Sequence, residues 1–280
     1  MTVINTNTGS LYAQQAMTTN ARGLSTVMQQ LSTGKRINNA VDDVAGMAIS
    51  TRLTSQIRGL NQAVRNTNDG ISLIQTAEGT TEQVTNMLQR MRELAVQASN
   101  DTNNTSDRVY LNLEFQALNT QVTKIAEFTQ WNASNIIDGS NSGSGSGVFS
   151  FQVGANSAQT ISVTLPNLQT QGAGALSNIA SSVVTSTTDA NSALGSISTA
   201  LDTVNLARAK MGAVISRLQF TADNLANVSA KAQESRSRIE DTDYSQATTE
   251  LAKRNIIQQA AQAMLAQANQ QPQTVLQLLR

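Results

Sequence analysis

The sequence predicts a mainly α protein, with long antiparallel coiled-coil helical arms from both termini and a small central β-hairpin region. Apolar residues recur three or four positions apart over long stretches of both halves, as in coiled-coil helices. Aromatic residues make up only 3% of the chain and proline occurs twice, which suits long helices with small side chains between them. In the centre this periodicity gives way to a Gly/Ser-rich run and two short alternating segments.

The N-terminal half carries one long apolar stripe, and it crosses Asn68-Asp69-Gly70 without losing phase. These three residues are typical of a turn, but a stripe of this length predicts that the helix continues through them. A break is predicted at residues 100–106, followed by another helix from Asp107 to about Gln130. The stripe consists of Ile49, Leu53, Ile57, Leu60, Val64, Ile71, Ile74, Ala77, Val84, Leu88, Met91, Ala95 and Ala98.

The C-terminal half carries a similar stripe from Leu194 to Ile239, over roughly six heptads. It predicts one long helix, with Asp189 as its N-cap. The acidic run 240–243 is interpreted as the end of this helix and the cap of the next one, since carboxylates are favourable at a helix N-terminus. Asp42-Asp43 is likewise interpreted as an acidic loop or helix start.

The centre is predicted to be a short variable tip. Residues 139–147 have the composition of a flexible linker. Residues 149–153 and 161–165 alternate apolar and polar side chains around a short polar turn, which predicts a β-hairpin, and residues 166–188 are predicted to be irregular with one short helix. Because loop closure depends weakly on length, we expect replacement of residues 143–184 to cost little.

Both ends of the chain are almost free of charge. Residues 1–34 contain only Arg22, and residues 255–279 contain no charged residue. Identical charges brought together in a homopolymer repel one another, so uncharged amphipathic ends are suited to self-assembly, and we expect their faces to lack a partner within a single pair of arms. The candidate polymerisation residues are Leu24, Val27, Met28, Leu31, Ile257, Ala261, Met264, Leu265, Ala268, Val275, Leu276, Leu278 and Leu279.

Composition excludes several classes of function. The 19 basic and 19 acidic residues leave no net field for nucleic acid or an anionic membrane, and eight Gln in residues 255–279 argue against a membrane span. The absence of His excludes Ser/His triads and His-based zinc sites. No enzyme, metal or cofactor is therefore expected. The first residues lack the pattern of a cleavable signal peptide, so export would use another route.

Five segments resemble bacterial flagellin. They are LSTGKRINNAVDDVAGMAIS (31–50), NDGISLIQTAEG (68–79), LQRMRELAVQASN (88–100), SRIEDTDYSQATTELAK (237–253) and the ending AQANQQPQTVLQLLR. The resemblance covers roughly 1–138 and 187–280, in the same order. It implies an inner terminal helical domain (1–42 and 246–280), a helical coiled-coil domain (43–138 and 187–245) and the tip (139–186).

The resemblance also implies a function and its partners. The chain would be a secreted subunit of the extracellular flagellar filament, exported through the flagellar type III apparatus without a cleaved signal peptide. Partners would be further copies of itself, the cap and hook-associated proteins, and an export chaperone. Two alternatives stay open: a hook–filament junction protein of the same superfamily, and a cytoplasmic coiled-coil adaptor or amphipathic membrane binder.

A recognition site is also predicted on the N-terminal long helix. At 100° per residue, Leu94 lies about 80° from the centre of the buried stripe, between Arg90 and Gln97. Taken alone, an outlying leucine is more often surface filler than an interface anchor. By resemblance, however, these three residues, with Gln89 and Glu114, match the patch through which many flagellins engage the vertebrate Toll-like flagellin receptor.

Overall fold

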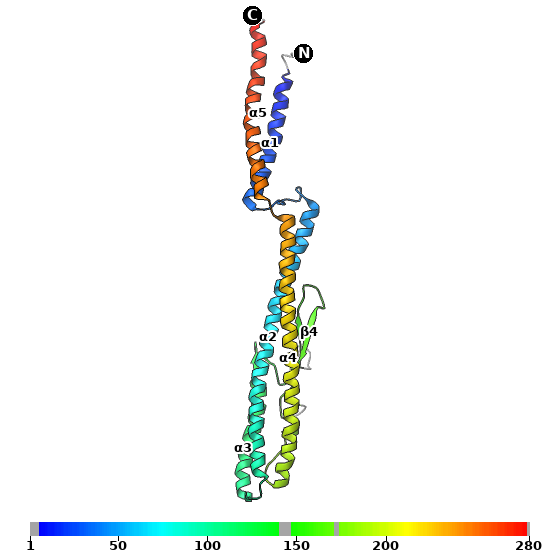
Figure 1. Cartoon of the computed structure of the whole chain (residues 1–280), viewed down its shortest axis with the longest axis vertical. Coiled ribbons are helices and arrows are strands. Elements are labelled where there is room, and N and C mark those ends of the chain that lie inside the picture. Colours follow the sequence, from blue (N-terminus) through cyan, green and yellow to red (C-terminus); the bar gives the residue numbers. More distant parts are fainter. Residues whose placement is uncertain (1–5, 140–146, 171–173, 279–280) are drawn as a thin grey trace. The chain divides into compact units, whose positions relative to one another are not determined.

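The computed structural model describes residues 6–139, 147–170 and 174–278, with side chains described up to residue 270 (Figure 1). The mainly α fold class is confirmed. In order, the elements are α1 (Thr8–Thr33), α2 (Val44–Ala98), α3 (Thr105–Phe128), β1 (Gln130–Trp131), β2 (Ser134–Asn135), β3 (Val148–Gln152), β4 (Thr160–Thr164), a 3-10 helix (Ser177–Ile179), α4 (Thr187–Glu240) and α5 (Tyr244–Leu278).

The chain forms two compact units. The end unit comprises residues 1–57 and 230–280, and the middle unit comprises residues 58–229. Each unit therefore combines segments that are far apart in the sequence. The three-part division expected from the sequence stays a prediction.

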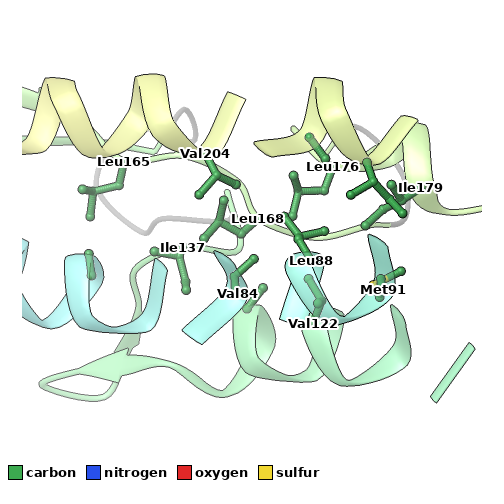
Figure 2. Close-up of a cluster of buried hydrophobic side chains, with 14 of the residues drawn as sticks. Val84, Leu88, Met91, Val122, Ile137, Leu165, Leu168, Leu176, Ile179 and Val204 are labelled. Atoms are coloured by element: carbon green, nitrogen blue, oxygen red, sulfur yellow. The ribbon is translucent and has the colours of Figure 1, made fainter. Parts of the chain in front are cut away.

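The core of the middle unit includes the central segment. Buried apolar residues from α2, α3 and α4 form one cluster with seven side chains of the predicted tip. Figure 2 shows Leu165, Leu168 and Leu176 among side chains of α2 and α4. The expectation that loss of this segment costs little is therefore wrong, because its inward-facing side chains fill the core. These seven residues are Ile161, Val163, Leu165, Leu168, Leu176, Ile179 and Val184.

The β3–β4 hairpin packs on α2. Its strands are antiparallel, with Phe151 opposite Ile161. A Cβ atom added at Gly70 would lie 3.1 Å from the Phe151 ring, and Asn66 Nδ2 donates a hydrogen bond to Gln152 O at 3.1 Å. The Asn-Asp-Gly triplet is helical, as the stripe predicts, and its glycine leaves space for the aromatic ring. The predicted linker lies largely in residues 140–146, outside the described residues.

A second, very small hairpin was not predicted. Strands β1 and β2 pair around Asn132 and Ala133, whose φ angles are 47° and 62°. Positive φ at both central residues is the geometry of a tight hairpin turn. Asn132 was a usable signal for this turn, but alanine in the next position is unusual there. The predicted end of α3 at Gln130 was therefore two residues too late.

The helix starts depend on side-chain caps. Asn104 and Asp107 form a reciprocal capping box at α3. At α4 the cap is Ser186, whose Oγ accepts a hydrogen bond from Asp189 N at 3.1 Å and donates to the Asp189 carboxylate at 2.7 Å. The prediction that Asp189 is the N-cap is therefore wrong by three residues. The hydroxyl groups of Ser186 and Thr185 lower the pKa of Asp189.

Candidate assembly and recognition surfaces

Helices α1 and α5 form an antiparallel pair in the end unit (Figure 1). Polar contacts connect them along their length. Asn7 Nδ2 donates to Ala268 O at 2.7 Å near one end of the pair, and Tyr244 Oη donates to Leu31 O at 3.1 Å near the other. The two uncharged ends of the chain therefore lie side by side.

The pairing divides the candidate polymerisation residues into two groups. Leu24, Val27, Leu31, Ala261, Leu265 and Ala268 occupy the less exposed side of their helices. Met28, Ile257 and Met264 are 53%, 42% and 65% exposed. The expectation that the end faces have no partner within the chain is therefore wrong, because each helix covers the other. The side chains of Val275, Leu276 and Leu278, and all of Leu279, lie outside the described residues.

Three exposed apolar residues of this pair were missed by the sequence analysis. Leu11, Tyr12 and Ile256 are 58%, 74% and 66% exposed. They lie off the helical stripes and were therefore not selected, although they belong to the same weakly charged segments. The apolar surface of the pair is consequently larger than predicted.

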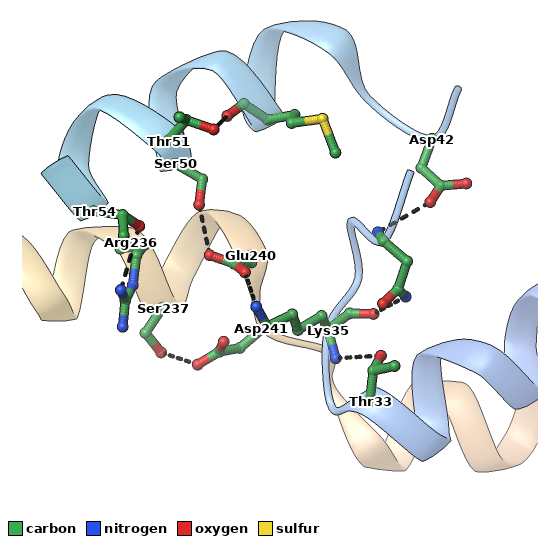
Figure 3. A network of polar contacts seen from close by, with 12 residues as sticks. Thr33, Lys35, Asp42, Ser50, Thr51, Thr54, Arg236, Ser237, Glu240 and Asp241 are labelled. Atoms are coloured by element: carbon green, nitrogen blue, oxygen red, sulfur yellow. Dashed lines mark hydrogen bonds and ion pairs between the residues drawn. The ribbon is translucent and has the colours of Figure 1, made fainter. Parts of the chain in front are cut away.

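A polar network joins the segments that flank this helix pair (Figure 3). The Glu240 carboxylate accepts hydrogen bonds from Lys35 Nζ and Ser50 Oγ, both at 2.5 Å. Backbone contacts reinforce it, since Arg36 N donates to Glu240 O at 2.6 Å and Thr242 N donates to Gly34 O at 3.0 Å. The two connections between long and terminal helices are thereby bound to each other.

Both acidic segments singled out in the sequence contribute helix caps here. Asp43 Oδ1 accepts a hydrogen bond from Gly46 N at 2.8 Å at the start of α2. Asp243 Oδ1 accepts one from Ser245 N at 2.9 Å at the start of α5. The interpretation of these carboxylates as helix-start residues is confirmed.

The Glu240 network predicts a pH-dependent stability of the end unit. Hydrogen bonds from Lys35, and then from Ser50, lower the pKa of Glu240. Because the folded-state pKa is depressed, the stabilisation is complete above the unfolded-state pKa of about 4.3 and is lost as pH falls through the lower folded-state value. We expect Glu240→Gln to reduce the thermal stability of the helices at pH 7, with a smaller difference from the parent at pH 3, which is below the unfolded-state pKa.

Circular dichroism melting curves of both proteins at the two pH values check this prediction. Glu82→Gln, at an exposed position of α2, is the matched control. An equal difference between parent and Glu240→Gln at pH 7 and pH 3 would show that the ionised carboxylate is not what stabilises the junction.

The predicted recognition residues lie on α2 and α3 of the middle unit, where Arg90 joins the two helices. Its guanidinium forms ion pairs with Glu114 and Glu93, both at 2.9 Å. Hydrogen bonds to Glu93 and Glu114 raise the pKa of Arg90. These charged groups are about half exposed, so the pairs position the side chains more than they stabilise the fold.

Leu94 is not part of the exposed patch. Its side chain is only 1% exposed and belongs to the core cluster. Its position along the helix places it outside the predicted stripe, but the cluster draws side chains from α3 as well as α4, and this widens the buried arc of α2 beyond the stripe. Leu94 therefore belongs to the core beneath the patch and not to its exposed surface.

The remaining predicted residues flank a shallow groove. Gln89 and Gln97 are exposed and line a depression of about 420 Å³ together with Arg92, Glu93 and Val96. Glu93 connects this groove to Arg90 through their ion pair. Exposed apolar residues that the sequence did not single out lie on α2 and α3, namely Val96, Val109, Tyr110 and Leu113.

Neither a metal cluster nor a membrane span is evident in the described part of the chain. Within those ranges no group of three or more potential metal ligands converges. No helix there is long and apolar enough to cross a membrane.

Comparison with known proteins assigns the family. The bacterial flagellin N-terminal helical region matches residues 4–142, and the bacterial flagellin C-terminal helical region matches residues 194–279. The sequence is 45% identical to a flagellin of Halalkalibacterium halodurans, covering 99% of this chain and 100% of that one. It is 39% identical to a flagellin of Bacillus subtilis, covering 99% of each.

A solved structure shares the fold. A putative flagellar hook-associated protein from Vibrio parahaemolyticus superposes with a TM-score of 0.60, covering 71% of this chain and 100% of that one, at 13% sequence identity. At that identity the likeness concerns the fold alone. With both family regions matched in order and relatives aligned over nearly their whole length, the chain belongs to the bacterial flagellins, structural proteins that build the extracellular flagellar filament.

Proposed function

We propose that the α1·α5 pair is the surface through which the chain packs into the filament. Large exposed apolar side chains on two nearly uncharged segments carry this proposal, since such side chains are suited to contacts between copies. Met28, Ile257 and Met264 would contact neighbouring subunits, and the less exposed candidates would hold the pair together. The terminal candidates Val275, Leu276, Leu278 and Leu279 are assigned to the same surface.

A single charge should test this assignment. Ile257→Asp is expected to leave the helices folded, because the side chain is 42% exposed, but to slow polymerisation at least about tenfold by placing an unpaired charge in each subunit contact. Asn has nearly the same shape as Asp but carries no charge, so Ile257→Asn should slow polymerisation less than Ile257→Asp. Light scattering of seeded polymerisation gives the rates, and normal assembly of Ile257→Asp would contradict the proposed contact.

We further propose the three-part division into residues 1–42 with 246–280, 43–138 with 187–245, and 139–186. In this division the terminal part would be innermost in the filament. The family resemblance also supports export without a cleaved signal peptide through the flagellar type III apparatus, with an export chaperone, and addition of subunits beside the cap and hook-associated proteins. These partners are carried over from the family.

We also propose that the folded monomer is recognised by the vertebrate Toll-like flagellin receptor through Gln89, Arg90, Gln97 and Glu114, with Leu94 as the buried support. The ion pair between Arg90 and Glu114 supports this proposal, because it orients the guanidinium, and Glu93, the second carboxylate paired with Arg90, lines the groove together with Val96. Arginine beside apolar surface is a frequent component of interface hot spots.

Receptor activation should depend on both members of this ion pair. We expect Arg90→Ala and Glu114→Ala monomers each to weaken signalling about tenfold or more in a receptor-reporter assay, while Arg217→Ala, at an exposed arginine of α4, signals like the parent. Intact filaments should be poor agonists because neighbouring subunits would cover the patch. Absence of any response to parent monomer would refute this carried-over role.

Folding has to be measured alongside signalling. Leu94→Ala is expected to destabilise the middle unit by about 2–5 kcal/mol, as for other buried leucines. Its loss of signal should therefore accompany unfolding, whereas Arg90→Ala should lose signal with its melting curve preserved.

A further inference from the structure

We infer that Asn20 and Gln258 set the register of the α1·α5 pair. Asn20 is 6% exposed, and its Nδ2 donates hydrogen bonds to Arg254 O at 2.9 Å and to Gln258 Oε1 at 3.1 Å. In α1 the buried residues are Asn20 and Val27. In the described part of α5 the buried residue is Ala247. Because so little apolar surface is buried between the two helices, apolar packing alone favours one register over another only weakly.

The less exposed positions of both helices follow a heptad pattern, and this pattern places the two amides opposite each other. On α1 it includes Met17, Asn20 and Leu24, and on α5 it includes Gln258 and Ala261. In the observed register Asn20 faces Gln258, so Met17 faces Ala261. Asn20 can find a backbone carbonyl in any register, because every residue of α5 has one. Its contact with the Gln258 side chain depends on the register.

Contacts elsewhere in the pair agree with the same alignment. Asn7 contacts Ala268 and Leu31 contacts Tyr244, so the partner numbers fall along α5 as they rise along α1. Both of these contacts use a backbone carbonyl. They therefore accept neighbouring registers more easily than the amide pair does.

A slip by one heptad would separate the two amides. Asn20 would face Leu251 or Leu265, and Gln258 would face Ala13 or Val27. Asn20 would keep a backbone carbonyl but lose its second acceptor, Gln258 Oε1, and Gln258 would lose its donor inside the seam. Losing a hydrogen bond at a buried amide costs free energy. A single polar residue at a seam position fixes register in coiled coils by the same effect.

Register matters for assembly because it sets the positions of exposed side chains relative to one another. A slip by one heptad would move Met28 by about 10 Å relative to Ile257 along the helix axis. The surface offered to neighbouring subunits would no longer be the same in every copy. This consequence rests on the proposed role of the α1·α5 pair in assembly, whereas the register assignment itself does not.

Disulfide trapping tests the register in the full chain, which contains no native cysteine. Met17→Cys with Ala261→Cys reports the observed register, and Met17→Cys with Ala268→Cys reports a slip by one heptad. Crosslinks within one chain keep the monomer mass on a non-reducing gel, which separates them from crosslinks between chains. In the parent background we expect the first pair to crosslink at least about tenfold more than the second.

Changes at the amides should alter this ratio. Asn20→Leu with Gln258→Leu is expected to raise the slipped crosslink at least about tenfold, equivalent to about 1.4 kcal/mol, with helical content unchanged and filament yield reduced. Asn20→Gln with Gln258→Asn keeps two amides and should retain the observed register, and Gln14→Leu, at an exposed position of α1, controls for added apolar surface.

Two results would overturn the register assignment: equal trapping of both cysteine pairs in the parent, or an unchanged ratio in the leucine variant. The comparison of the two cysteine pairs in the parent needs no change at the amides. It therefore still tests the register assignment if the leucine variant misfolds. Slipped crosslinks together with a normal filament yield would instead support the register assignment and contradict the assembly role of the pair.

Discussion

Removal of residues 1–34 or of residues 255–280 is expected to leave a largely helical protein that no longer forms filaments. The first truncation removes α1 and the second removes most of α5, so either one leaves the remaining helix without its partner. The middle unit retains its own hydrophobic cluster and should stay folded. Loss of assembly should therefore not require loss of the core.

Sedimentation and electron microscopy of the two truncated proteins measure assembly, and far-ultraviolet circular dichroism measures the remaining helix. The full chain, purified and seeded in the same way, is the control. Normal filaments from either truncated protein would show that the α1·α5 pair is dispensable and would contradict its proposed role.

Replacement of residues 143–184 by a short Gly/Ser loop is expected to unfold the middle unit. The replaced segment contains all of β3 and β4 and seven buried apolar side chains of the core. Truncating one large buried side chain costs about 2–5 kcal/mol, whereas a typical domain is stable by only about 5–15 kcal/mol. The combined loss therefore exceeds what the unit can tolerate.

A smaller replacement in the same segment provides the control. Residues 156–158 at the turn of the β3–β4 hairpin are exposed, and Ala158 has a φ angle of 64°, which glycine adopts without strain. Exchange of these three residues for Gly-Ser-Gly should leave the urea concentration at the midpoint of unfolding nearly unchanged. If the protein with the larger replacement folds and has the same urea midpoint of unfolding as the parent, the central segment does not contribute to stability, as was expected from the sequence.

The long helices could be predicted from sequence because their periodicity extends far beyond any local signal. The stripe through α2 outweighs the turn-like Asn68-Asp69-Gly70, and the structure adds the reason for the glycine, which contacts Phe151. The acidic helix starts at Asp43 and Asp243 were also predictable, since capping depends on neighbouring residues.

The burial of Leu94 and of the central segment could not be predicted in the same way. A stripe measured along one helix does not reveal how many neighbours that helix has, and Leu94 belongs to a core cluster that draws side chains from α3 and α4 as well as α2. Likewise, the alternation around Val163 identifies a strand without identifying the surface that it covers. Both errors arise from contacts between segments far apart in sequence.

The candidate assembly surface was partly predictable. The absence of charge identified both ends of the chain, but the pairing of α1 with α5 depends on contacts such as Asn20 with Gln258, which are 238 positions apart. The assignment to the flagellins favours the filament subunit over the cytoplasmic adaptor and over the hook–filament junction protein.

A reconstruction of the assembled filament by electron cryomicroscopy would show directly whether the α1·α5 pair packs between subunits. The measurement is the accessible surface of Leu11, Met28, Ile256, Ile257 and Met264 in a subunit surrounded by its neighbours. We expect these side chains, which are all more than 40% exposed in the single chain, to become buried against adjacent copies. A filament in which the α1·α5 pair contacts no neighbour, with these five side chains still exposed, would contradict the proposed role of this pair in assembly.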